Sequence, residues 1–136
     1  MTRNNLFTSL NKLCNNLDNK YNINSGGCCY VAACLAEQLE LHNIPFKVIY
    51  YDLWSCHYAI KVSDRYLNRC DYKKKEITEI YNISSEELFD IYDENDWNES
   101  YNIDNNEKVK QSIVTVFKKY ENSRTRLRSR AIGQRK

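Results

Sequence analysis

The stretch Ser25-Gly26-Gly27-Cys28-Cys29-Tyr30-Val31-Ala32 determines how the rest of the chain is interpreted. Two adjacent glycines permit a sharp turn, because a residue without a Cβ adopts most backbone conformations at little steric cost. The largely apolar residues 28–41 that follow predict one long, central helix, and Pro45 prevents its continuation. This places the thiol of Cys28 on a first helical turn, where unpaired N–H groups and the macrodipole favour an anion. Because the thiolate is the competent nucleophile, Cys28 is the candidate nucleophile of the chain.

A histidine and a carboxamide follow at intervals that suit a Cys-His-Asn arrangement. A cysteine nucleophile needs a base, and it needs a third group that fixes the tautomer of the imidazole. His57 opens a β-rich run, and Ser63-Asp64 predicts a tight turn into the next one. In such a hairpin Asn68 pairs with Ala59 and lies diagonal to His57 on the same face of the sheet. We therefore expect His57 to be the base and Asn68 its orienting residue, with Asp71 as the competing orienter.

The periodicity of apolar residues predicts an α+β fold, in which N-terminal helices precede a three- to four-stranded antiparallel sheet and the nucleophile helix packs on that sheet. A capping box, Ser84 followed by Glu87, predicts a helix start. We expect one domain over residues 1–121 and a basic, disordered tail over 122–136. The expected helices are 4–19, 28–41, 85–92 and 105–120, and the expected strands are 46–51, 57–62, 65–70 and 76–81.

The charge of the chain is unevenly distributed. Its 136 residues carry a net charge of +2, but Arg124 to Lys136 contains six basic residues and no acidic one. Without those six, fourteen basic residues stand against eighteen acidic ones, so the body has a net charge of −4. The tail is either a solubilising end or a site of sequence-independent contact with a polyanion. The residues expected to make that contact are Arg124, Arg126, Arg128 and Arg130.

The cysteines and the absence of targeting signals indicate a reducing compartment. No apolar run is long enough to span a bilayer, and the N-terminus lacks a signal-peptide pattern, so we expect no membrane contact and a cytoplasmic location. A phage-encoded protein would act in the host cytoplasm or the virion. The spacing of the six cysteines does not suggest a disulfide framework. No cofactor is expected, and a zinc site is a minor alternative, because adjacent ligands are geometrically awkward. Its ligands would come from Cys28, Cys29, Cys56, His57 and Cys70.

These residues resemble the papain-like and transglutaminase-core superfamily, in particular its small phage and bacterial members. The resemblance covers about residues 25–71 and is carried by Gly26-Gly27-Cys28, by His57-Tyr-Ala-Ile-Lys-Val and by Arg65-Tyr66-Leu67-Asn68. It implies a thiol peptidase, amidase or acyl transferase with Cys28 as nucleophile, His57 as base and Asn68 as the third residue of the catalytic triad. The chain departs from many transglutaminase-like members, in which a tryptophan follows the histidine and the third residue is aspartate.

The expected function is acyl transfer from a peptide or amide substrate through a Cys28 thioester, with water or an amine as acceptor. The N–H of Cys28 is one expected oxyanion donor, and Asn24 or Asn22 could supply an amide. Trp54 is a candidate wall of the substrate cleft, or else an exposed loop residue. The alternatives are a catalytically silent binding or phage structural protein of the same fold, and a nucleic-acid-associated protein that binds through its tail.

Overall fold

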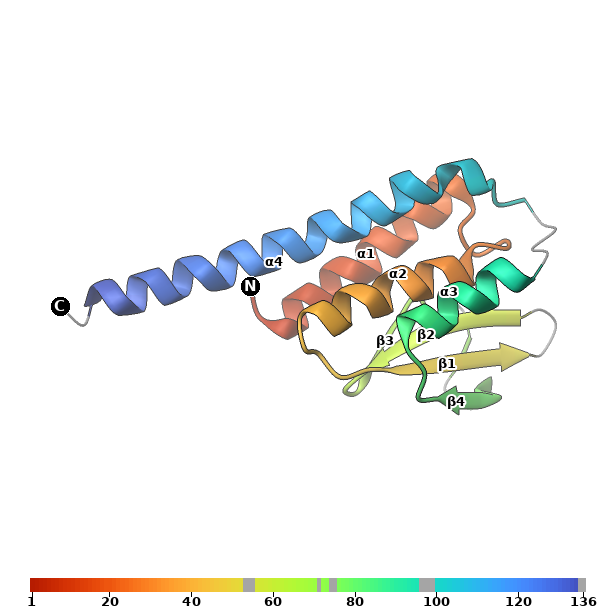
Figure 1. Cartoon of the computed structure of the whole chain (residues 1–136), viewed down its shortest axis with the longest axis horizontal. Coiled ribbons are helices and arrows are strands. Elements are labelled where there is room, and N and C mark those ends of the chain that lie inside the picture. Colours follow the sequence, from red (N-terminus) through yellow and green to blue (C-terminus); the bar gives the residue numbers. More distant parts are fainter. Residues whose placement is uncertain (53–55, 71, 74–75, 96–99, 135–136) are drawn as a thin grey trace.

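The computed structural model describes residues 1–52, 56–70, 72–73, 76–95 and 100–134, with side chains as far as Thr125. Helices and strands follow one another in the order that the sequence predicts, and the fold is α+β (Figure 1). A short 3-10 helix, η2, was not expected. The elements are α1 (Arg3–Tyr21), α2 (Cys28–Leu41), β1 (Lys47–Asp52), β2 (Cys56–Val62), β3 (Arg65–Leu67), β4 (Glu79–Tyr81), α3 (Ser85–Glu94), η2 (Ile103–Asn105) and α4 (Asn106–Gln134).

The four strands form one antiparallel sheet with the order β3-β2-β1-β4. The turn predicted at Ser63-Asp64 is confirmed, since Val62 pairs with Arg65 directly across it. Ser63 has a φ of 55°, a left-handed conformation that short hairpin turns require. β3 ends at Leu67, earlier than predicted, and Asn68 leaves the strand with a φ of 58°.

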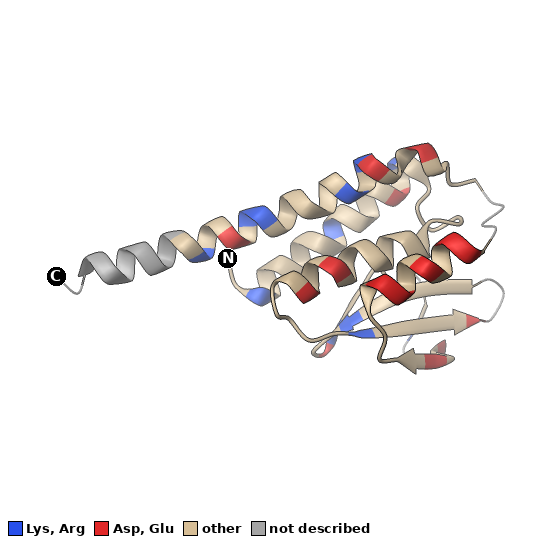
Figure 2. Cartoon of the chain, in the orientation of Figure 1, with Lys and Arg blue, Asp and Glu red and all other residues tan. Residues whose placement is uncertain are grey.

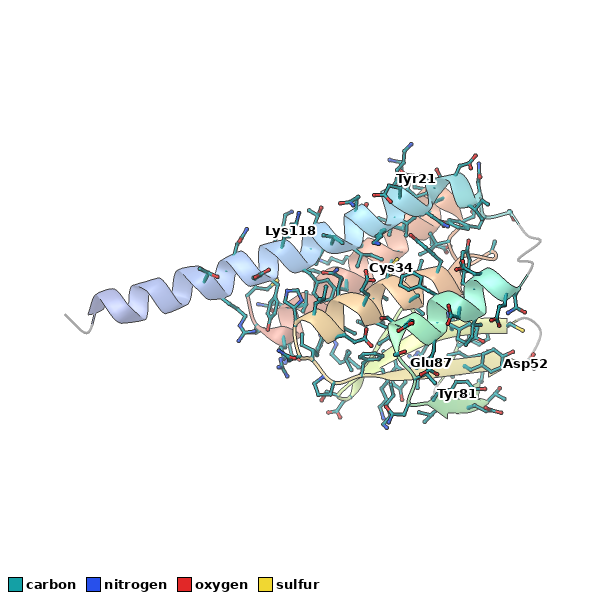
Figure 3. The ribbon with its side chains drawn as sticks, viewed as in Figure 1. Tyr21, Cys34, Asp52, Tyr81, Glu87 and Lys118 are labelled. Carbon is teal, nitrogen blue, oxygen red and sulfur yellow. The ribbon has the colours of Figure 1, made fainter. Side chains whose placement is uncertain are left out.

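Helix α2 is the centre of the fold, as its composition predicts. Its bounds are those expected from the sequence, and ten of its fourteen residues are buried. It packs on β2 and α3, while α1 and α4 lie on the other side of the helical layer (Figure 1). Burial on so many sides explains why the helix lacks a polar face. Cys34, labelled in Figure 3, lies inside this layer.

A second, smaller apolar cluster covers the opposite face of the sheet. It contains Ile49, Tyr51, Ala59 and Tyr72, and Tyr72 comes from the segment that follows β3. Side chains alternate along β1, so Val48 joins the main core whereas Ile49 and Tyr51 join this cluster. The sheet is therefore packed on both faces near β1 and β2.

The last helix is longer than expected. The predicted end near Tyr120 is wrong, because α4 continues to Gln134 and its far half projects away from the body (Figure 1). The helical segment includes Arg124, Arg126, Arg128 and Arg130, which we expected in a disordered tail. No proline interrupts it, and arginine and leucine are good helix formers. In the described part of the chain, none of the helices is both long and apolar enough to cross a lipid bilayer.

Candidate active site

The glycine turn before α2 is held in place by close packing. Gly26 has a φ of 106°, a conformation that residues with a Cβ rarely adopt. A Cβ on Gly27 would lie 2.8 Å from the carbonyl oxygen of Ile23 and 2.8 Å from Cδ2 of Tyr101. Tyr101 also donates its backbone N–H to the carbonyl of Ser25 at 2.9 Å. The turn therefore fits only glycine at these two positions.

Cys28 is the first residue of α2, as predicted. Its N-cap, Gly27, has no side chain to accept a hydrogen bond from the first amides of the helix. The Sγ of Cys28 lies 3.9 Å from the carbonyl oxygen of Cys56, the residue before His57. The Cys28 side chain is only 2 % exposed. The thiol is thus buried between the first turn of α2 and the edge of the sheet where β2 begins. Asp52, which pairs with Cys56, marks this edge in Figure 3.

The ring of His57 lies on the sheet face opposite α2. His57 is in register with Tyr51, and their ring centroids are 5.9 Å apart. On the same face the imidazole stacks on Tyr72 with an interplanar angle of 9° and a centroid distance of 5.0 Å. Tyr58, the next residue, packs against the main core instead. Cys28 and His57 therefore both lie near the first residues of β2, with the thiol on the helix side of the strand and the imidazole on the opposite side. His57 is only 2 % exposed.

One hydrogen bond determines which ring nitrogen of His57 can act as a base. Its Nε2 is 2.7 Å from the backbone carbonyl oxygen of Asn68. A carbonyl only accepts hydrogen bonds, so Nε2 must carry the proton. In the neutral ring Nδ1 is then unprotonated and is the nitrogen that can accept a proton. Burial lowers the pKa of His57 below its ordinary value, although the bond to Asn68 and the charge of Asp18 act in the opposite direction.

Asn68 contacts His57 through its main chain, whereas we expected its side chain to orient the ring. Its side-chain amide instead pairs reciprocally with that of Asn24, with N···O distances of 3.2 and 3.0 Å. Its N–H donates to the side-chain oxygen of Asn11 at 3.0 Å, and Asn11 in turn donates to the carbonyl of Tyr66 at 2.9 Å. These contacts fix the carbonyl that holds His57. In this arrangement Asn24 supports Asn68.

Two residues that the sequence predicts for the site, Trp54 and Asp71, lie outside the described residues.

Two residues that support the site, Asn11 and Tyr101, were not predicted from the sequence. Asn11 is one of several polar residues on α1, and nothing in its local pattern indicates the contact with β3. Three other thiols are buried in the core, and burial is the main cause that raises the pKa of each to about 12; they belong to Cys14, Cys29 and Cys34.

Among the described residues, no group of three or more His, Cys, Asp or Glu side chains is arranged to hold a metal ion.

Comparison of the chain with protein-family models, curated proteins and solved structures found no match in any of the three. What is established about the fold is therefore the α+β class and the four-stranded antiparallel sheet.

Because the imidazole of His57 is buried, we expect the folded protein to lose stability in acid. Because the pKa of His57 is lowered from 6.5 in the folded chain, the unfolded chain binds more protons at pH values between the two pKa values. The free energy of unfolding should decrease as the pH is lowered from about 6.5 towards the folded-state pKa. Urea unfolding at about pH 7 and about pH 5 measures the decrease. His57→Gln should make this decrease smaller; an equal decrease in the wild type and in His57→Gln would contradict the prediction.

Proposed function

We propose that the protein is a cysteine-dependent acyl-transfer enzyme, a thiol peptidase, amidase or transglutaminase-like transamidase with a papain-like arrangement. Cys28 is the nucleophile, His57 the base and Asn68 the orienting residue. The observation that carries this proposal is the hydrogen bond between His57 Nε2 and the Asn68 carbonyl, because it leaves Nδ1 as the basic nitrogen. The approach of the Cys28 thiol to the main chain of Cys56 supports it further.

The proposed reaction has two stages. The fold holds the Cys28 thiol on the helix side of β2 and the His57 ring on the other side, so the first stage requires the two side chains to meet past the end of the strand. Nδ1 of His57 then removes the thiol proton as the Cys28 sulfur attacks the carbonyl carbon of the substrate. The same proton passes to the leaving amine as the C–N bond breaks, and a thioester remains on Cys28. In the second stage water or an amine attacks the thioester, giving hydrolysis or transamidation. The first amides of α2, which no N-cap side chain satisfies, are suited to stabilise the oxyanion.

Burial of both side chains sets a condition on this mechanism. Cys28 and His57 are each 2 % exposed, so a substrate must displace covering groups before it reaches the sulfur. The lowered pKa of His57 favours a neutral imidazole at rest, which takes the thiol proton during attack. This differs from a resting thiolate–imidazolium pair.

Thiol labelling tests the proposal. We expect iodoacetamide to alkylate Cys28 faster than the exposed Cys56 and Cys70 near neutral pH, and His57→Ala to abolish this preference. Peptide mass spectrometry locates the label. If Cys56 and Cys70 react first, and Cys28 only after unfolding, the protein is instead a catalytically silent binding or structural protein.

We also propose a polyanion contact through the projecting end of α4. The feature that favours it is the end of α4, which extends beyond the body (Figure 1) and carries four arginines and no acidic residue over residues 124–134. On the body, acidic residues are prominent along α3 (Figure 2). The contact would be made by Arg124, Arg126, Arg128 and Arg130.

Deleting residues 124–136 should lower the salt concentration at which the protein elutes from a heparin column, because fewer phosphate-like contacts release fewer counterions. Acyl transfer by the truncated protein should be unchanged. The exposed pair Lys118 and Lys119 is the control, and changing both to glutamine should have a much smaller effect on elution. Equal elution of the full-length and truncated proteins would refute the contact.

A further inference from the structure

A polar hollow, lined in part by Asn68, lies between α1 and the segment that contains β3. Its volume is about 600 Å³, and its described lining includes Asn11, Asn15 and Asn68 together with two arginines. Neither Cys28 nor His57 belongs to this lining. The hollow is therefore separate from the proposed reaction and shares with it only the residues that hold the His57 ring.

The first arginine, Arg65, is held in a defined orientation. Its Nη1 donates to the carbonyl of Asn4 at 2.8 Å and to the hydroxyl of Thr8 at 3.0 Å, both on the first turns of α1. These contacts use one end of the guanidinium, so its Nε and Nη2 donors remain for another acceptor. Holding the side chain in this way lowers the entropy that is lost when a ligand binds.

The second arginine, Arg69, is positioned by an aromatic ring. Its guanidinium carbon lies 5.1 Å from the centroid of Tyr66, a cation–π geometry that leaves the edge of the fork free to donate. Both arginines are half-buried. A half-buried guanidinium is more costly to leave unpaired than one in open solvent.

Among the residues that the structure describes, no carboxylate forms an ion pair with either guanidinium group. In the described ranges, the ion pairs are those of His42 with Glu121 and of Lys110 with Glu37, so neither arginine takes part in one. Asp64 also lines the hollow, but it is exposed and is a single acid against two bases. The described lining of the hollow thus carries a net positive charge.

We propose that this hollow binds a compact oxyanion, a carboxylate or phosphate group, between Arg65 and Arg69. Planar guanidinium groups form paired hydrogen bonds with such oxygens, and the amide of Asn15 can add another donor. The site does not depend on the reactivity of Cys28. A carboxylate would come from an acidic peptide or metabolite, and a phosphate group from a phosphorylated one.

The test is an NMR titration of the full chain with inorganic phosphate and, separately, with N-acetylglutamate. We expect saturable shifts of the amide signals of residues 11–15 and 65–69, with half-saturation in the millimolar range or below, on the order of 1 mM. Arg69→Gln should weaken binding about tenfold or more through the loss of one charge-assisted pair. Arg69→Lys, which keeps the charge and removes the planar fork, should weaken it less.

The control is Lys118→Gln, which removes an equal charge from the exposed surface of α4 (Figure 3) and should leave binding unchanged. Saturation by phosphate alone would indicate a phosphorylated ligand, and saturation by both probes a carboxylate-tolerant site. Shifts that grow linearly to about 50 mM, or that sodium chloride reproduces at equal ionic strength, would overturn the proposal. An equal loss of affinity in Lys118→Gln would do the same.

Discussion

Replacing Cys28 with serine is expected to lower the rate of acyl transfer from an activated ester, such as p-nitrophenyl acetate, by a factor of about 10³ or more. Serine differs from cysteine by one atom and should preserve the start of α2. Its hydroxyl is a far weaker nucleophile, because it is hardly ionised at neutral pH. Release of p-nitrophenolate measures the rate, and mass spectrometry of the acyl-enzyme locates the thioester.

The matched controls are Cys56→Ser and Cys70→Ser. Both thiols are exposed, so they are the groups with which an ester would react without catalysis. We expect each control to retain most of the rate, and His57→Ala to lose nearly as much as Cys28→Ser, because residues that act as a unit are not additive. A rate that follows Cys56 or Cys70 instead would show that the ester reports only exposed thiols.

Gly27→Ala is expected to lower the free energy of unfolding by about 1–3 kcal/mol, the usual cost of overpacking. The added Cβ would meet the Ile23 carbonyl oxygen and the Tyr101 ring, each at 2.8 Å. The ring can move, but the carbonyl belongs to the main chain and cannot shift without disturbing the turn. Urea unfolding followed by circular dichroism measures the change.

Two variants show whether the loss arises from this contact. Asn16→Ala, at an exposed position of α1, should leave stability nearly unchanged. Combining Gly27→Ala with Tyr101→Ala should give less than the sum of the two losses, because the ring is no longer in the way. An unchanged unfolding midpoint in Gly27→Ala would mean that the turn is looser than the packing indicates.

Local patterns predicted most of the fold. The apolar run of α2 and the turn at Ser63-Asp64 determine their elements through contacts between near neighbours in the chain, so the sequence reveals them. The capping box is confirmed in the same way, since the Ser84 side chain accepts from the N–H of Glu87. The length of α4 could not be predicted from apolar periodicity, because residues 121–134 contain few apolar side chains, although arginine itself favours helix.

The details of the site depend on contacts that the sequence does not indicate. Asn68 was expected to use its side chain, but its left-handed backbone brings its carbonyl to His57 and its amide to Asn24. Asn11 and Tyr101 reach their partners from distant parts of the chain, and neither stands in a recognisable motif. Such long-range polar contacts follow from the packing of whole elements, which periodicity does not specify.

The central claim is that the His57 ring activates the Cys28 thiol, and the pH dependence of Cys28 alkylation tests it most directly. Intact-protein and peptide mass spectrometry can follow the rate from about pH 5 to about pH 9 in the wild type and in His57→Ala. We predict that the wild-type rate rises with a midpoint below 6.5, as His57 loses its proton. In His57→Ala this rise should be lost, and the rate should increase only at alkaline pH, where free thiols ionise. Superimposable profiles for the two proteins would contradict the account.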